Sequence, residues 1–228
     1  MNYKIADSKF KEILIPSLLM VMALNISSVV DSLFVCAFIG PNAVAALELL
    51  EPLLLLMTVF EWLFGLGGQI IAINKKSKFD IDGSNRYCTT SIVTTFIASL
   101  IMAIICFLFV DPLATVLGSS PATKPPVIQY SIFGCFVVST LVAILTQYIR
   151  VDDQPKFAST LIIIANIINI ILDYVFLSSG MGMASASLAS FIGYTVTLVI
   201  CLRYIHNPKR TFRFVRSSLK IKTFIKTT

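Results

Sequence analysis

Residues 157–177 read FASTLIIIANIINIILDYVFL, an almost continuous run of aliphatic and aromatic side chains. A helix needs about 20 apolar residues to cross the hydrocarbon core of a bilayer, which is roughly 30 Å thick. Three polar residues interrupt the run: Asn166, Asn169 and Asp173. At about 100° per residue they fall within about 60° of one another on one helix face. The run therefore predicts a membrane-spanning helix with a single polar stripe.

The composition of the whole chain indicates the same class of protein. Of its 228 residues, 57% are hydrophobic and 13% are charged, whereas charged residues make up about 25% of a soluble domain. Six apolar runs are long enough to cross a bilayer, and none alternates polar and apolar residues as barrel strands do. These predicted spans are residues 13–39, 43–73, 88–110, 127–149, 157–177 and 183–204. The predicted fold class is an all-α integral membrane protein, with residues 1–205 forming a six-helix transmembrane lobe.

The basic residues predict the orientation of this lobe. All but one of the 18 Lys and Arg residues lie before the first span, follow the second or fourth span, or close or follow the sixth. The exception is Lys124, between the third and fourth spans. Because cytoplasmic loops collect Lys and Arg, both termini are predicted to be cytoplasmic, in a multi-pass protein of the plasma (inner) membrane. The net charge of +6 then reflects membrane topology rather than a nucleic-acid partner.

The connections between the spans are short on the exterior side, with one exception. Residues 40–42 and 178–182 predict tight turns, whereas residues 111–126 are rich in Pro and Ser and predict a loop with at most one short interfacial turn. After the last span, residues 206–228 alternate basic residues with apolar ones such as Phe212. This segment is either an amphipathic linker on the anionic inner leaflet or a disordered basic tail.

The first predicted span carries a second polar group. Its members are Asn25, Ser27, Ser28, Asp31 and Ser32. Asp31 lies roughly 12 Å below the exterior end of its helix, and its side chain is too short to reach the interface. A charge at the bilayer centre costs about 2.5 to 3.5 kcal/mol on insertion scales and normally faces a cavity, a partner or an ion path. We therefore expect Asp31 and Asp173 to share a water-accessible pocket between the first and fifth spans. The alternative for Asp173 is an interfacial cap of the last hairpin.

The second predicted span contains three glutamates at different depths. Glu48 and Glu51, near the exterior end, line the outer mouth of the pocket or lie among the headgroups; Glu61 lies near the middle of the run. The GLGG sequence at residues 65–68 permits close helix approach or local unwinding. Along the path that a substrate would take, the predicted lining residues are Asn25, Glu51, Glu61 and Gln69.

No pattern in the chain indicates an enzyme. The only histidine is His206, in the basic tail, and there is neither a phosphate-binding glycine loop nor a nucleophile with a plausible base. The five cysteines show no spacing typical of a disulfide framework or a zinc site. No cofactor is expected.

Three stretches of the chain resemble the multidrug and toxic compound extrusion (MATE) family. The first is IPSLLMVMALNISSVVDSLFVCAFIGPNAVAAL, which carries Asp31, Phe34, Gly40, Pro41 and an Ala-Ala pair in the family's order. The second is FGLGGQIIAINKKSKFD, and the third runs from RVDDQPKFA through NIINIILDYVFLSSGMGMASASLAS. Together the similarity covers nearly all of residues 13–204.

The resemblance implies one lobe of a twelve-helix antiporter that is coupled to H⁺ or Na⁺ and exports organic cations or amphipathic drugs. The ion-coupling residues it implies are Asp31, Asn169, Asp173 and Ser190, with Asn166 on the same polar stripe. If the coupling ion is Na⁺, its ligands are expected to be Asp31, Asn169 and Asp173. No other metal site is expected.

The family's proteins have two such lobes, and alternating access rocks one against the other. The second lobe is expected from a split partner chain or from a parallel homodimer, or else the chain is a fragment. Two alternatives to drug export stay open. A lipid-linked oligosaccharide flippase would be expected to carry basic residues inside its helices, and none clearly lies there; a non-transporting fragment or assembly subunit would have no complete pathway.

Overall fold

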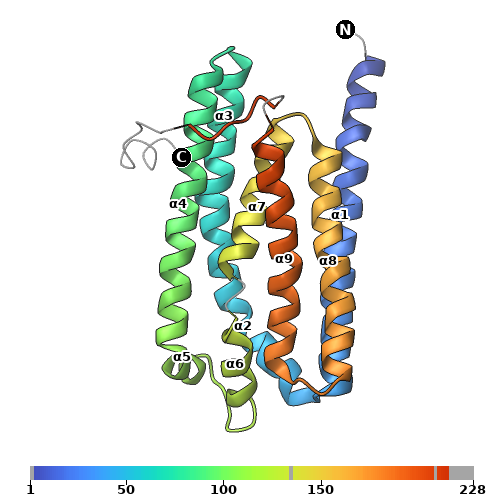
Figure 1. Ribbon diagram of the computed structural model, residues 1–228, viewed down its shortest axis with the longest axis vertical. Coiled ribbons are helices and arrows are strands. Elements are labelled where there is room, and N and C mark those ends of the chain that lie inside the picture. The colour runs from blue at the N-terminus through green and yellow to red at the C-terminus, as the bar shows by residue number, and fades with distance from the viewer. Residues whose placement is uncertain (1–2, 134–135, 208–209, 216–228) are drawn as a thin grey trace.

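The computed structural model describes residues 3–133, 136–207 and 210–215, and these residues form helices and connecting turns without strands (Figure 1). The elements are α1 (Tyr3–Phe38), α2 (Pro41–Phe60), the π-helical turn η1 (Glu61–Leu66), α3 (Gly67–Ser77), α4 (Ile81–Leu108), α5 (Val110–Val116), α6 (Lys124–Ser131), α7 (Phe136–Val151), α8 (Pro155–Ser178) and α9 (Met183–Ile205).

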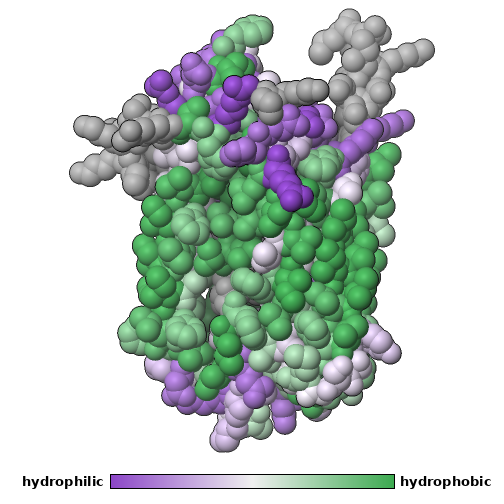
Figure 2. Space-filling view, viewed as in Figure 1, coloured by the Kyte–Doolittle hydropathy of each residue, from purple (hydrophilic) through white to green (hydrophobic). Residues whose placement is uncertain are grey.

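Five helical stretches of the described chain are long and apolar enough to cross a membrane. They cover residues 14–38, 41–77, 81–108, 155–178 and 183–205, and a shorter apolar helix covers Val137–Val151. Figure 2 shows the result as a broad hydrophobic belt between two polar ends. The predicted all-α bundle of six spans is confirmed.

The fourth predicted span and the loop before it differ from the prediction. Residues 127–149 belong to two helices, α6 and α7, rather than one. Residues 111–126, predicted to be a loop, contain α5 and the beginning of α6. The prolines Pro125 and Pro126 lie in the first turn of α6, where a missing N–H is not needed and the fixed φ of proline favours a helix. The Pro-rich sequence therefore starts a helix here.

The bundle is built from neighbouring helix pairs. α1 packs along α8, α8 along α9, and α3 against α4, while α7 lies between α4 and α9 (Figure 1). Gly193 of α9 permits the close approach to α8, because a Cβ at this position would lie 2.7 Å from the carbonyl oxygen of Ala165. Small residues at such contacts let helix backbones approach within van der Waals distance in a membrane.

The second span is interrupted by the π-helical turn η1, which shifts the register of the backbone hydrogen bonds. Two side chains from other helices donate to carbonyls of this turn: Ser91 of α4 to Phe64, and Tyr148 of α7 to Gly65 at 3.5 Å. In lipid such carbonyls need a partner inside the protein. Gly68, just beyond, lies so close to Ser91 that a Cβ would be 2.7 Å from its side chain. The glycines of the GLGG sequence thus serve close packing beside a locally altered helix.

Both ends of the described chain lie at the same end of the bundle, together with the α3–α4 and α7–α8 connections (Figure 1). We call this the basic end. Here residues 210–215 run across the helix ends. Phe212 is buried and stacks on Tyr148, with ring centroids 5.6 Å apart, so this aromatic ring faces the bundle rather than the leaflet expected for it. Residues 208–209 and 216–228 of the predicted amphipathic segment lie outside the described residues.

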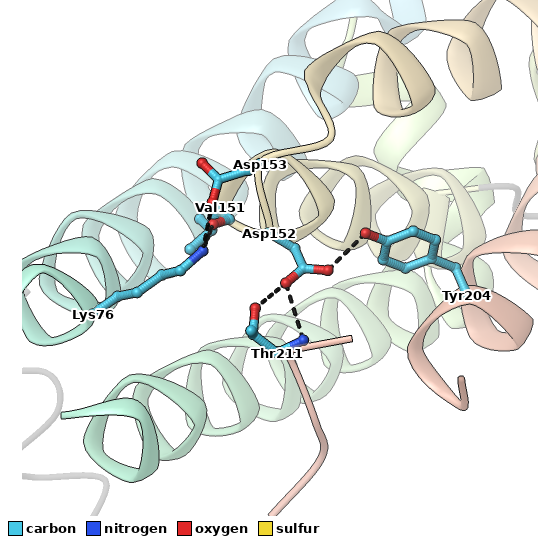
Figure 3. Close-up of polar contacts among 6 residues, drawn as sticks. All are labelled: Lys76, Val151, Asp152, Asp153, Tyr204 and Thr211. Atoms are coloured by element: carbon cyan, nitrogen blue, oxygen red, sulfur yellow. Dashed lines mark hydrogen bonds and ion pairs between the residues drawn. The ribbon is translucent and has the colours of Figure 1, made fainter. Parts of the chain in front are cut away.

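Asp152 holds residues 210–215 to the bundle (Figure 3). Its Oδ2 accepts a hydrogen bond of 2.7 Å from the hydroxyl of Tyr204, and its Oδ1 accepts from the backbone N–H of Thr211 at 3.2 Å and from the Thr211 hydroxyl. The amide of Asn85 also pairs with this segment: Nδ2 donates to the Thr211 carbonyl and Oδ1 accepts from the N–H of Arg213, both at 3.2 Å. Side chains thus supply the partners that this extended backbone needs.

Candidate functional site

A cavity of about 320 Å³ opens among α1, α2, α8 and α9 in the half of the bundle away from the basic end. Six residues predicted as functional line it. They are Asp31, Glu51, Asn166, Asn169, Asp173 and Ser190. The structure therefore brings together polar residues of α1, α2, α8 and α9 that are up to 159 positions apart in the chain.

The side chains of α1 and α8 interact directly across this cavity. Asn169 Nδ2 donates to Asp173 Oδ2 at 2.8 Å and to Ser190 Oγ at 3.1 Å, and its Oδ1 accepts from the hydroxyl of Ser27 at 3.5 Å. Asp31, on α1, and Asp173, on α8, line the same cavity. One amide thus fixes the orientation of Asp173 and ties α8 to both α1 and α9.

Two carboxylate oxygens in this cavity lack a hydrogen-bond donor. Asp31 Oδ1 and Asp173 Oδ1 are buried, and neither accepts a hydrogen bond from any donor in the described residues. Asp173 as a whole is only 2% exposed. Buried carboxylates without donors are costly, and each remaining oxygen can accept a proton or coordinate a hard cation such as Na⁺. The donor set of carboxylate and hydroxyl oxygens fits either ion.

Two residues predicted for the substrate path line neither this cavity nor the one described next. Asn25 is exposed and donates to the carbonyl of Val21 at 2.8 Å. It lies six residues before Asp31, which places it about 120° away around the helix. Gln69 is buried and donates to the carbonyl of Gln147 at 3.1 Å, in the contact between α3 and α7. One amide lies on the outer face of α1 and the other joins two helices, so the assignment of both residues to a substrate path stays a prediction.

A second cavity, of about 410 Å³, adjoins the first and lies nearer the basic end. The two share Leu24, Leu54, Ser139 and Tyr194 in their linings. Glu61 lines the second cavity and accepts a hydrogen bond of 3.4 Å from Gln147 Nε2. Arg150 lines it as well. The sequence had placed Arg150 after the fourth span, but α7 continues to Val151, so a basic side chain does enter a cavity.

The model of the MatE protein family matches residues 16–175. The chain belongs to the MatE family. The matched region contains Asp31, Asn166, Asn169 and Asp173, and it ends before Ser190. No match was found among curated protein sequences.

Solved structures of MATE transporters share the fold of this MatE chain. The Vibrio cholerae MATE transporter VcmN in its bent form superposes with a TM-score of 0.87 at 18% identity, over 99% of this chain and 51% of that one. A multidrug resistance MATE family transporter of the MOP superfamily, in its outward-facing conformation, gives 0.84 at 17% identity, over 94% and 49%. A MOP superfamily transporter from Pyrococcus furiosus gives 0.81 at 17%, over 94% and 48%.

The chain spans about half the length of these transporters. The six spans of this MatE chain thus form one lobe of a MATE-like transporter, as the sequence predicted. The sequence reading missed several polar cavity residues, among them Ser139, Tyr194 and Arg150. Ser139 and Arg150 lie on α7, and Tyr194 lies on α9. The one available signal was the spacing of Gln147 and Arg150, which places both on one helix face.

Proposed function

We propose that the chain forms one lobe of a cation-coupled multidrug efflux antiporter of the MatE family. It lies in the plasma membrane with both termini cytoplasmic, and it contributes to the export of organic cations or amphipathic drugs. The observation that carries the proposal is the pair of carboxyl groups, Asp31 and Asp173, that line one cavity and each have a buried oxygen that accepts no hydrogen bond from the described residues. The basic end is the cytoplasmic end by the distribution of Lys and Arg.

The carboxyl pair supplies a site for the coupling ion, H⁺ or Na⁺. Two neighbouring carboxylates cannot both carry charge cheaply at low dielectric, so binding of one cation neutralises the pair. Release of that cation restores negative charge in the cavity and favours entry of a cationic substrate. Asn169 holds Asp173 in place in both states, and Ser27 and Ser190 offer further oxygens. Glu51, at the cavity wall, adds negative charge on the substrate's side.

A second lobe completes the pathway in this proposal. The most hydrophobic stretch of α1 is only 11% buried within the bundle, against 39% for those of α8 and α9. Leu33, 61% exposed, belongs to this uncovered face of α1. A split partner chain, a further segment of the same polypeptide or a second copy in parallel orientation can each cover it.

Transport in proteoliposomes tests the proposal. With the second lobe supplied, ethidium should accumulate inside the liposomes against its own gradient when the H⁺ or Na⁺ concentration is higher inside than outside. Asp31→Asn and Asp173→Asn should reduce this flux to that of empty liposomes, since neither amide can exchange a cation. Asp111→Asn is the matched control, because this carboxylate is exposed and pairs with Lys124 at 3.0 Å outside the cavity. Undiminished flux in both cavity variants would contradict the proposal.

A photo-reactive amino acid at Leu33 tests for the second lobe. In native membranes we expect a cross-linked product either at twice the mass of the chain, for a parallel homodimer, or at the mass of a partner chain. The same probe at Ile101 of α4, also exposed, serves as the control on another face. If Leu33 yields lipid adducts alone, the chain acts as a non-transporting fragment.

One observation favours the second candidate, a lipid-linked oligosaccharide flippase. Such a protein needs a basic group for the pyrophosphate inside the membrane, and Arg150 enters the second cavity from α7. Flipping of a fluorescent lipid pyrophosphate by the same proteoliposomes, lost in Arg150→Gln and unaffected by Asp31→Asn, would favour this function over drug export.

A further inference from the structure

Arg150 is the only basic residue that lines either of the two large cavities in the described chain. It lies in the last turn of α7 and is half-buried. Its Nη2 contacts the thioether sulfur of Met20, on α1, at 2.9 Å. A guanidinium group carries five N–H donors, and a thioether is a weak acceptor. This contact therefore satisfies little of its hydrogen-bonding capacity.

The guanidinium lacks an acidic partner in the residues that the structure describes. No carboxylate there lies within ion-pair distance of Arg150, and its Nε is buried without a hydrogen-bond acceptor. A cation taken partly out of water without a partner is costly. The side chain is thus held in an arrangement that an anionic group entering the cavity would stabilise.

An acidic residue, Glu61, lines the same cavity as Arg150. Glu61 Oε1 accepts a hydrogen bond from Gln147 Nε2 at 3.4 Å, and Gln147 lies one helical turn before Arg150 on α7. Residues at this spacing have Cβ atoms about 5 to 6 Å apart. Gln147 therefore separates the two charges, which stay unpaired with each other and both line the cavity.

We propose that this second cavity is a binding subsite for zwitterionic amphipathic molecules. The anionic group, a carboxylate, sulfonate or phosphate, pairs with Arg150, and the cationic group faces Glu61. The remaining lining, with Leu24, Leu54, Met57 and Ile162, takes the apolar body. The cavity volume of about 410 Å³ lies within the range of about 300 to 1,000 Å³ typical of small-molecule sites.

The subsite extends the proposed function, since it adds zwitterions to the organic cations expected at the carboxyl pair. It rests on the proposed function only for the transport of the bound molecule. Binding itself requires neither an ion gradient nor a second lobe. A binding experiment therefore separates the two: loss of transport in the carboxyl variants with intact zwitterion binding concerns the proposed function alone.

Two dyes that differ in a single charge test the subsite. Tetramethylrhodamine carries a free carboxylate beside its cationic ring system, and its methyl ester carries the cation alone. Fluorescence anisotropy with the purified full chain in detergent measures both affinities. Charged hydrogen bonds contribute about 1.5 to 3 kcal/mol, so Arg150→Gln should weaken binding of the free carboxylate about 10-fold or more and that of the ester less than 2-fold.

Two further variants make the outcome decisive. Arg150→Lys keeps the charge and should retain most of the preference for the free carboxylate. Arg203→Gln removes a positive charge from an exposed position at the same end of the bundle and should alter neither affinity. An Arg150→Gln variant that is monodisperse and binds both dyes like the unmodified chain would overturn the proposal. So would an unmodified chain that binds neither dye, or that binds the ester and the free carboxylate equally.

Discussion

Aspartate carboxyls lie inside the bundle at both of its ends, but their oxygens differ in how many hydrogen bonds they accept. At the basic end, both oxygens of Asp152 accept hydrogen bonds, from Tyr204 and from Thr211. In the cavity at the other end, Asp31 and Asp173 each keep an oxygen that accepts no hydrogen bond from a described donor. Hydrogen-bond donors offset the cost of taking a carboxylate out of water, whereas a buried carboxylate oxygen without a donor keeps that cost. The number of donors, rather than burial alone, therefore distinguishes the carboxylate at the basic end from the pair that we propose as the ion-coupling site.

The largest expected effect is a difference in stability between substitutions of aspartates at the two ends. Asp152→Asn should lower the free energy of unfolding by about 2 to 4 kcal/mol, because donors from Thr211 and Tyr204 lose a charged acceptor. Asp173→Asn should leave thermal stability unchanged or raised, because it removes one of two buried like charges. Thermal unfolding of both variants in detergent measures the difference. Equal destabilisation by the two substitutions would break the comparison between the ends.

The release of residues 210–215 sharpens the same comparison. In Asp152→Asn, backbone amides of Thr211 and Arg213 should exchange with deuterium at least about 10-fold faster, since loss of about 1.4 kcal/mol of local stability corresponds to a factor of ten. Asp153→Asn is the matched control. This neighbouring carboxylate is exposed and contacts Lys76 at 3.0 Å (Figure 3), and its loss should not alter exchange in the segment.

Two glycines test how closely the cavity depends on helix packing. Gly193→Ala should destabilise the lobe by about 1 to 3 kcal/mol, because its Cβ would meet the backbone of α8 at Ala165 and lie 3.5 Å from the N of Asn169. Gly65→Ala should be tolerated, since the Cβ would make ordinary contacts of 3.5 Å with Ile144. Thermal unfolding compares the two, and similar melting temperatures for both variants would argue against a rigid α8–α9 contact.

The smallest effect is expected at Asp80, a partly exposed carboxylate at the basic end. The N–H of Gly83 donates to it at 2.8 Å and Lys75 pairs with it at 3.1 Å, and these partners hold its pKa below the usual range. A group whose pKa is lower in the folded state stabilises that state above its unfolded pKa, which is about 3.9 for aspartate. Asp80→Ala should therefore lower the melting temperature at pH 7, and the difference should shrink as the pH falls below about 4.

Much of the candidate site could be predicted from polar residues inside apolar runs. The carboxyls at 31 and 173 and the amides at 166 and 169 are costly in lipid wherever the helices lie, so their placement in a cavity follows from composition and spacing. Asn25 met the same criterion and lies on the outer face of α1. A polar residue in a span indicates that it has a hydrogen-bond partner. For an amide that partner can be a backbone carbonyl of the same helix, as the carbonyl of Val21 is for Asn25.

The sequence by itself determined that the chain crosses the membrane six times and that its basic connections share one side. Both follow from the length and composition of local runs, because each residue's cost of transfer into lipid adds up along its own segment. Only the tertiary structure decided which polar groups meet. The contact of Asn169 with Ser27, the entry of Arg150 into a cavity and the tie between Asp152 and Thr211 depend on how each helix is rotated. They also depend on partners that lie 59 to 142 positions away in the chain. Transfer costs summed along a single segment do not show which residues of other helices that segment will contact.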